Sequence, residues 1–216
     1  MVVVFVKMSA HLMPYGAKNR MVLNIVFSGI GGQGIVVASD IFCEAALFDG
    51  LDVAKAEVHG MAQRGGSIVA HVRVGENVQA PLIETGKADI ILGFELLEAA
   101  RILPMLKKGG TVILNTKYIP PSTSVCSSSE FNHEKILELI QARVSKVYEI
   151  DAINIANRLG NILVVNTILL GALSSIPENP VTKESLEKAI AGRLKEKYVE
   201  LNLKAFNLGR EQANLG

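Results

Sequence analysis

The stretch LNIVFSGIGGQGIVVASDIF, residues 23–42, sets a cluster of glycines between two apolar runs. The first run predicts a buried strand over residues 22–27. The second has apolar residues at helical spacing and ends at Asp49 and Gly50. A glycine turn between a strand and a helix can cradle dinucleotide phosphates, bind another anion, or only let the two elements pack. The rest of the chain has to separate these three interpretations.

The composition is that of a protein built on a buried, largely parallel sheet. The chain has 216 residues, of which 49% are hydrophobic and only 5% aromatic. Aliphatic residues dominate strands that are buried on both faces. The formal net charge is +1, from 22 basic and 21 acidic side chains, and this near balance argues against nucleic acid as a partner.

The cysteines and the apolar runs limit the location and the cofactors of the chain. Only Cys43 and Cys126 are present, too few for an iron–sulfur cluster that needs four thiolates. They are typical of free thiols in a reducing cytoplasm, where we expect the protein to be. No run reaches the roughly 18 apolar residues of a membrane span, so no membrane partner is expected.

Strands and helices alternate through most of the chain. We therefore predict an α/β fold: a doubly wound, Rossmann-like, mostly parallel sheet with right-handed crossovers and a helical C-terminal portion beyond residue 152. Further strands are predicted at 52–58, 67–75, 88–94, 111–115 and 146–151. Helices are predicted at 95–110 and 133–144, and Thr182 is expected to cap a later one.

The chain is interpreted as a single domain with an extension at its start. Residues 21–216 form the α/β domain, and residues 1–20 show no clear period. We interpret residues 1–20 as an extension, either disordered or the product of a start codon upstream of Met21.

Gly29, Gly31 and Gly34 form a G-x-G-x-x-G pattern after a strand and before a helix. Gly29 permits a tight turn, Gly31 lets another group approach the backbone, and Gly34 lets helix and strand pack closely. A dinucleotide site also needs an acid near the end of the second strand, for which Glu57 is the candidate. Gly32 and Gln33 crowd the turn, and the pattern alone leaves anion binding and pure packing about even.

A second polar segment, AEVHGMAQRGGS, follows the next predicted strand. It contains the candidate ligand-facing residues His59, Gln63, Arg64, Gly65 and Gly66. Loops at the carboxyl ends of neighbouring strands face each other, so this segment is expected to lie beside the glycine turn, where Arg64 could clamp a phosphate or carboxylate. The alternative is an exposed turn with His59 bonded locally.

No catalytic constellation is present, and neither a catalytic residue nor a metal site is predicted. The sequence lacks G-x-S-x-G, H-E-x-x-H and any recognisable acid–base pair. His71, inside an alternating strand, is expected to be packed or exposed rather than to serve as a ligand. An enzyme that worked alone would be expected to show some candidate set of catalytic residues.

Together the two segments resemble a known family. GIGGQGIVVASDIFCEAAL and AEVHGMAQRGGSIVAHVRVG are similar to the gamma subunit or domain of 2-oxoacid:ferredoxin oxidoreductases. Within that group the chain looks most like the small beta subunit of indolepyruvate ferredoxin oxidoreductase. The likeness continues in ADIILGFELLEAAR and EIDAINIANRLGN and covers nearly the whole chain from about Met21.

The resemblance implies a division of labour between subunits. Thiamine diphosphate and [4Fe–4S] clusters are carried by a catalytic partner subunit, and ferredoxin takes the electrons indirectly. Coenzyme A is a cosubstrate that the corresponding subunit helps to enclose in relatives, and whether this chain contacts it stays open. No cofactor is expected to be bound by this chain alone. The implied role is that of an accessory subunit, inactive by itself, and a homodimer stays open for the chain expressed alone.

Two other interpretations stay open at this point. One is a Rossmann-type NAD(P) or nucleotide-binding oxidoreductase, which requires Glu57 as a ribose ligand. The other is a scaffold without ligand, in which the glycine turn is purely structural. The subunit interpretation instead requires a large apolar surface for a partner, with residues 162–173 as one candidate.

Overall fold

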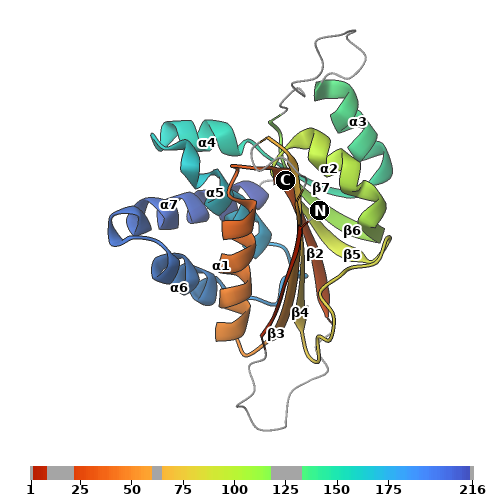
Figure 1. Cartoon of the computed structure of the whole chain (residues 1–216). Helices are drawn as coiled ribbons and strands as arrows, with labels where there is room; N and C mark the ends of the chain where they lie inside the picture. Colours follow the sequence, from red (N-terminus) through yellow and green to blue (C-terminus); the bar gives the residue numbers. More distant parts are fainter. Residues whose placement is uncertain (1, 9–21, 60–64, 118–132, 215–216) are drawn as a thin grey trace.

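The computed structural model describes residues 2–8, 22–59, 65–117 and 133–214, which form one α/β unit around a single sheet (Figure 1). Its strands are β1 (Val2–Met8), β2 (Leu23–Ile30), β3 (Asp52–His59), β4 (Ser67–Gly75), β5 (Ala88–Gly93), β6 (Leu106–Asn115) and β7 (Lys146–Ile150). Its α-helices are α1 (Ile35–Phe48), α2 (Leu96–Ile102), α3 (His133–Arg143), α4 (Ala152–Arg158), α5 (Val165–Ser174), α6 (Lys183–Arg193) and α7 (Glu196–Ala213). Short 3-10 turns, η1 (Leu103–Met105) and η2 (Ile162–Val164), precede β6 and α5.

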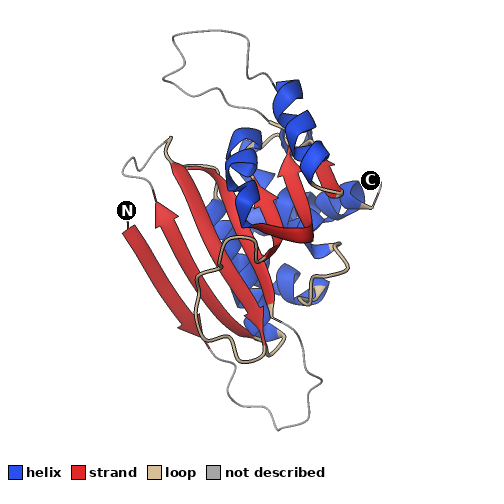
Figure 2. Cartoon of the chain, turned by 90° about the vertical axis from the view of Figure 1, so that its right-hand side faces the viewer, coloured by secondary structure: helices blue, strands red, loops and turns tan. Residues whose placement is uncertain are grey.

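Helices cover the sheet on both faces, as Figures 1 and 2 show. Alternate residues of β2 point to opposite faces, because successive side chains of a strand alternate. Phe27 joins the core formed with α1 and the C-terminal helices, whereas Val26 joins the core formed with α2 and α3. The three-layer arrangement confirms the predicted α/β class.

The sheet is mixed, which corrects the expectation of a mostly parallel one. The strand order is β1-β3-β4-β2-β5-β6-β7. β2, β5, β6 and β7 run parallel to their neighbours in this group. The pairs β1–β3, β3–β4 and β4–β2 are antiparallel. No helix separates β3 from β4, and a right-handed crossover between parallel strands requires one, so these two strands can only return antiparallel.

Part of the predicted N-terminal extension belongs to the sheet. The sequence predicts an extension over residues 1–20, but Val2–Met8 within it form β1 and pair in register with β3. The five-residue apolar run of this segment is strand-forming, and the open edge of β3 offers it a partner. Residues 9–21 lie outside the described part of the chain.

The helix predicted over residues 95–110 ends much earlier. α2 stops at Ile102, and Leu106 already begins β6. Pro104 accounts for this because its ring and its missing N–H end a helix. Residues 107–110 then bulge out of the β5–β6 pairing, since Ala88 faces Leu106 while Ile90 faces Thr111.

The sheet topology has a switch point at the carboxyl end of β2. The chain leaves β2 into α1 on one face of the sheet, whereas β5, next to β2, continues into α2 on the other. Such a switch of sides opens a crevice above the strand ends, where α/β proteins bind ligands. The glycine turn lies there. Within the described residues, no helix is long and apolar enough to cross a bilayer.

Candidate functional site

Close contacts fix the shape of the glycine turn. The backbone N–H of Ile30 donates to Gln33 Oε1 at 2.8 Å. A Cβ on Gly29 would lie 2.6 Å from that oxygen and 2.7 Å from Phe94 Cβ, so only glycine fits there. The first glycine therefore has a packing reason that holds with or without a ligand.

Two later glycines are needed for their backbone conformation. Gly32 has φ of 104° and Gly34 has φ of 78°, values that favour glycine. Gly34 is the N-cap of α1, and no side chain of the described residues caps that helix. A Cβ on Gly34 would also come within 2.8 Å of Asn166 Nδ2 on α5. The uncapped N–H groups of the first turn of α1 can attract an anion.

The described end of the second polar segment, Gly65 and Gly66, lies beside the glycine turn. β4 lies between β2 and β3, so the two segments do not follow neighbouring strands. They meet because β4 starts beside the end of β2, where the Gly31 N–H donates to the Gly66 carbonyl at 2.8 Å. Gly65, with φ of 75°, precedes this contact. Gln63 and Arg64 lie outside the described residues.

A row of ionisable side chains leads to His59. Lys55, Glu57 and His59 occupy alternate positions on β3 and share the face that packs on α1. Lys55 Nζ lies 2.5 Å from Asp40 Oδ1 on α1 and 2.6 Å from Glu57 Oε1. Glu57 Oε2 in turn lies 2.8 Å from His59 Nε2. His59 thus has a local partner and lies at the carboxyl edge of the sheet.

These contacts leave Glu57 unsuited to the ribose role. Burial raises the pKa of its carboxyl group, but the hydrogen bond and charge of Lys55, and then those of His59, lower it more. The pKa therefore lies below its ordinary value of 4.5. Both carboxylate oxygens are engaged by neighbours, and β3 is not adjacent to β2. The adenosine part of a dinucleotide site is not formed by these residues.

Two buried polar atoms near the same edge were not anticipated from the sequence. Ser28 Oγ on β2 and Asn115 Oδ1 on β6 are buried and have no hydrogen-bond partner within the part of the chain that the structure describes. The Asn115 amide N–H donates to the Phe94 carbonyl at 3.1 Å, which Gln33 also approaches. Buried polar groups are normally satisfied, so such atoms mark places where a ligand or water fits. The sequence signal that could have identified Asn115 as a candidate is a polar residue at the end of an apolar strand, as in TVILN.

Other candidate features lie away from this crevice. His71 is 8% exposed and its Nδ1 accepts the Ile83 N–H at 3.2 Å, so it is a packed residue, and burial lowers its pKa. A hollow of about 700 Å³ lies at the opposite edge of the sheet, between the start of β6 and the end of α3. Among the described residues, no group of three His, Cys, Asp or Glu could hold a metal ion.

Comparison with known proteins gives the family. Residues 24–212 match the model of the pyruvate ferredoxin/flavodoxin oxidoreductase family. Indolepyruvate oxidoreductase subunit IorB of Archaeoglobus fulgidus is 42% identical over 197 residues, 91% of this chain and 98% of that protein. The subunit of the same name from Pyrococcus horikoshii is 40% identical over 192 residues, 88% of this chain and 95% of that protein.

Solved structures agree with the sequence comparison. The gamma subunit of a keto/oxoacid ferredoxin oxidoreductase from Geobacter sulfurreducens has a TM-score of 0.67 and is 29% identical, covering 90% of this chain and 99% of that one. A 2-oxoglutarate:ferredoxin oxidoreductase from Magnetococcus marinus shares the fold with a TM-score of 0.69 at 21% identity, over 90% of this chain and 31% of that longer chain. With most of its length matched by the family model, the chain belongs to the pyruvate ferredoxin/flavodoxin oxidoreductase family.

Proposed function

We propose that this chain is the accessory, gamma-type subunit of a 2-oxoacid:ferredoxin oxidoreductase that acts on indolepyruvate or related arylpyruvates. The observation that carries the proposal is the 42% identity to a subunit IorB along 98% of that protein's length. Alignment from end to end supports the same role within an assembly, rather than a shared nucleotide-binding fold. The contacts of Glu57 favour this function over the NAD(P) alternative.

The proposed reaction divides between subunits. The partner subunit carries thiamine diphosphate, which supplies the decarboxylating chemistry, and [4Fe–4S] clusters, which pass electrons singly to ferredoxin. Two cysteines cannot ligate a four-thiolate cluster, which supports placing the clusters on the partner. Cys43 is moreover buried as a free thiol, and burial raises its pKa to about 12. A thiol that stays protonated is a poor metal ligand, and a reducing cytoplasm is the proposed location.

The proposed contribution of this chain is to bind an anionic part of a substrate in its crevice. The candidate residues are Gly29, Gly31, Gly32, Gln33, Gly34, His59, Gln63, Arg64, Gly65 and Gly66. Coenzyme A, through a phosphate, is the proposed occupant, and the uncapped N–H groups of α1 are its proposed donors. The buried polar atoms of Ser28 and Asn115 support a polar ligand at this edge.

Affinity purification from the native host tests the assembly. The tagged chain should bring down a larger subunit that contains iron and thiamine diphosphate, and the complex should oxidise arylpyruvates with coenzyme A and ferredoxin. The chain purified alone should be colourless and inactive in the same assay. Sedimentation of the lone chain shows whether it forms a homodimer. Robust 2-oxoacid oxidation by the lone chain would contradict the proposal.

A further inference from the structure

Two polar side chains interrupt the apolar helix α5. Every residue of this helix from 165 to 173 is buried. These residues therefore pack inside the chain and are not part of the exposed apolar surface expected for residues 162–173. Asn166 and Thr167 lie among them and are only 9% and 1% exposed. A buried polar group is costly unless it is hydrogen-bonded, so both positions need an explanation.

The hydroxyl and N–H groups of Thr167 are used within the fold. On α7, the side-chain amide of Asn202 donates to the Tyr198 carbonyl at 2.9 Å, which leaves Asn202 Oδ1 as an acceptor. The Thr167 hydroxyl donates to that oxygen at 2.7 Å. The backbone N–H of Thr167 donates to Asn166 Oδ1 at 2.9 Å. Thr167 is thus satisfied, and it fixes the oxygen of the Asn166 side chain.

Asn166 keeps one donor group that the fold does not use. A backbone N–H can only donate, so the side-chain oxygen of Asn166 is the atom turned toward Thr167, and the Nδ2 group points elsewhere. Among the described residues, Nδ2 has no hydrogen-bond acceptor. A Cβ on Gly34 would lie 2.8 Å from Nδ2, 3.2 Å from Cγ and 3.3 Å from Cβ of Asn166. The unused Nδ2 group is therefore the part of this side chain nearest to the glycine turn.

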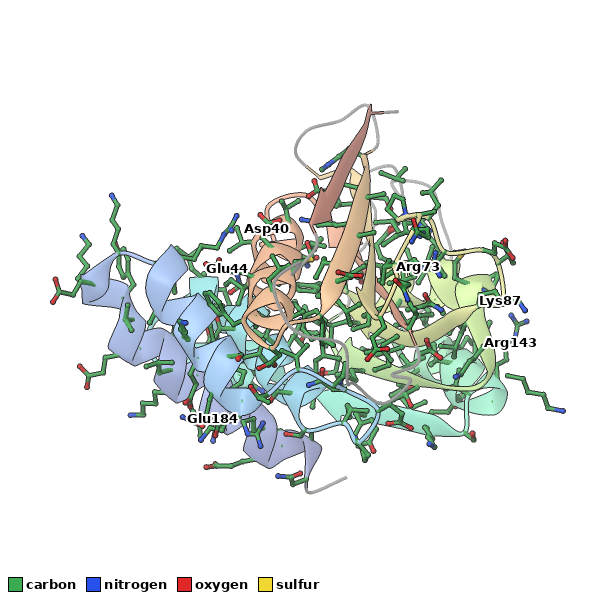
Figure 3. All side chains as sticks on the ribbon, turned by 90° about the horizontal axis from the view of Figure 1, so that it is seen from below. Asp40, Glu44, Arg73, Lys87, Arg143 and Glu184 are labelled. Atoms are coloured by element: carbon green, nitrogen blue, oxygen red, sulfur yellow. The ribbon has the colours of Figure 1, made fainter. Side chains whose placement is uncertain are left out.

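The same position adjoins the N-terminus of a helix that lacks compensation. Gly34 is the N-cap of α1, whose first turn contains no acidic residue. The acids Asp40 and Glu44 lie further along α1, where Figure 3 shows them together, and both pair with Arg193 on α6. The first-turn N–H groups of α1 and the Nδ2 group of Asn166 are all donors. An oxyanion is the kind of ligand that accepts from both.

We propose that Asn166 is a binding residue of the glycine-turn site, where its Nδ2 group and the N-terminus of α1 together hold one phosphate or carboxylate group. The N–H of Thr167 keeps the amide in the orientation that presents Nδ2 to the turn. That the bound group belongs to a substrate rests on the proposed function, whereas the pair of donors rests on the fold of this chain alone.

Proton–nitrogen NMR of the full chain tests this directly, with titrations of inorganic pyrophosphate and, separately, of acetate. The backbone amides of Ile35, Val36 and Val37 report on the N-terminus of α1, and the side-chain amide of Asn166 reports on the proposed donor. We expect both sets of signals to move together and to give the same dissociation constant. A response to pyrophosphate alone identifies a phosphate group, and a response to acetate alone identifies a carboxylate. Movement of the backbone signals without Asn166, or no movement at all, would overturn the proposal.

Two substitutions measure the contribution of the donor. Asn166→Ala removes it, and Asn166→Asp replaces it by a carboxylate oxygen while keeping the acceptor for the Thr167 N–H. We expect the Ala variant to bind the anion roughly tenfold to a hundredfold more weakly, which corresponds to the loss of one hydrogen bond to a charged group. The Asp variant should bind more weakly still, because its carboxylate repels the anion.

Asn207→Asp is the matched control for the added charge. The Asn207 amide donates to the Leu203 carbonyl within α7, so binding by this variant should stay within roughly threefold of the unaltered chain. Equal binding by the unaltered chain and both Asn166 variants would overturn the proposal, and so would an equal loss in the control. If the Asn166 variants do not fold, the side-chain signal of the unaltered chain decides alone. Failure to copurify with a cluster-containing subunit would remove the proposed function and leave the anion site in place.

Discussion

Lys55 shows how a single residue links the core to the candidate site. The alternation in DVAKAEVH predicts that Lys55, Glu57 and His59 share one face of a strand. The sequence does not show that this face packs against a helix, because charged residues usually indicate a face exposed to solvent. The structure places it under α1, where Asp40 supplies the countercharge.

Replacing Lys55 by Met should lower the free energy of unfolding by about 3 kcal/mol, because Asp40 and Glu57 lose the ammonium group that balances them. The value lies at the lower end for a broken buried pair, since the Asp40 side chain is 28% exposed. Urea denaturation followed by far-UV circular dichroism measures the change.

Lys146→Met is the matched control for this substitution. Lys146 pairs with Glu178 at 2.9 Å, but both side chains are well exposed. Such surface pairs are screened by solvent and contribute little, so this variant should unfold almost as the unaltered protein does. Equal losses in the two variants would show that burial of the Lys55 pair has no energetic consequence.

At the scale of elements, α5 and α7 are in backbone contact. A Cβ on Gly171 would lie 2.0 Å from the Phe206 carbonyl oxygen, and one on Gly209 would lie 1.9 Å from that of Ile168. The two glycines therefore let the helices approach more closely than side chains permit. The sequence predicts the helices of this region but not this contact, because the two glycines lie far apart in the chain.

Gly171→Ala and Gly209→Ala should each destabilise the protein by about 3 kcal/mol, the upper end for overpacking, because the helices must separate. The melting temperature should fall accordingly in calorimetry.

Gly192→Ala provides the comparison within another helix. Its Cβ would meet nothing nearer than Glu44 Oε1 at 4.0 Å. Alanine favours helix over glycine by up to about 1 kcal/mol, so this variant should be as stable as the unaltered chain or slightly more so. A similar loss of stability in all three variants would show that replacing glycine by alanine is itself destabilising, whether or not the glycine lies at the contact between α5 and α7.

At the scale of the whole molecule, periodicity predicts the fold class well and the strand directions poorly. The glycine turn, the buried strands and the helix at 35–48 are confirmed, because each depends on local pattern. The antiparallel half of the sheet depends on the short connection between β3 and β4. A parallel arrangement of these two strands would need a connection long enough to contain a helix. Ser28 and Asn115 could not be predicted as unpaired, since their partners depend on tertiary contacts.

We propose that residues 21–216 behave as one domain, because both cores share the same central strands. Unfolding in urea should therefore be a single transition, with midpoints that coincide when followed by circular dichroism and by tyrosine fluorescence. Tyr148 and Tyr198 report from β7 and α7, at distant positions in the chain. Separate midpoints would divide the chain into two units.

The place of β1 at the outer edge of the sheet has a consequence during synthesis. β1 leaves the ribosome before its partner β3, which begins 44 residues after Met8. At roughly 5–20 residues per second, VVVFVKM waits on the order of 2–9 s before a neighbouring strand exists. An apolar strand without a partner is prone to aggregate, so the nascent chain should depend on holding chaperones in that interval.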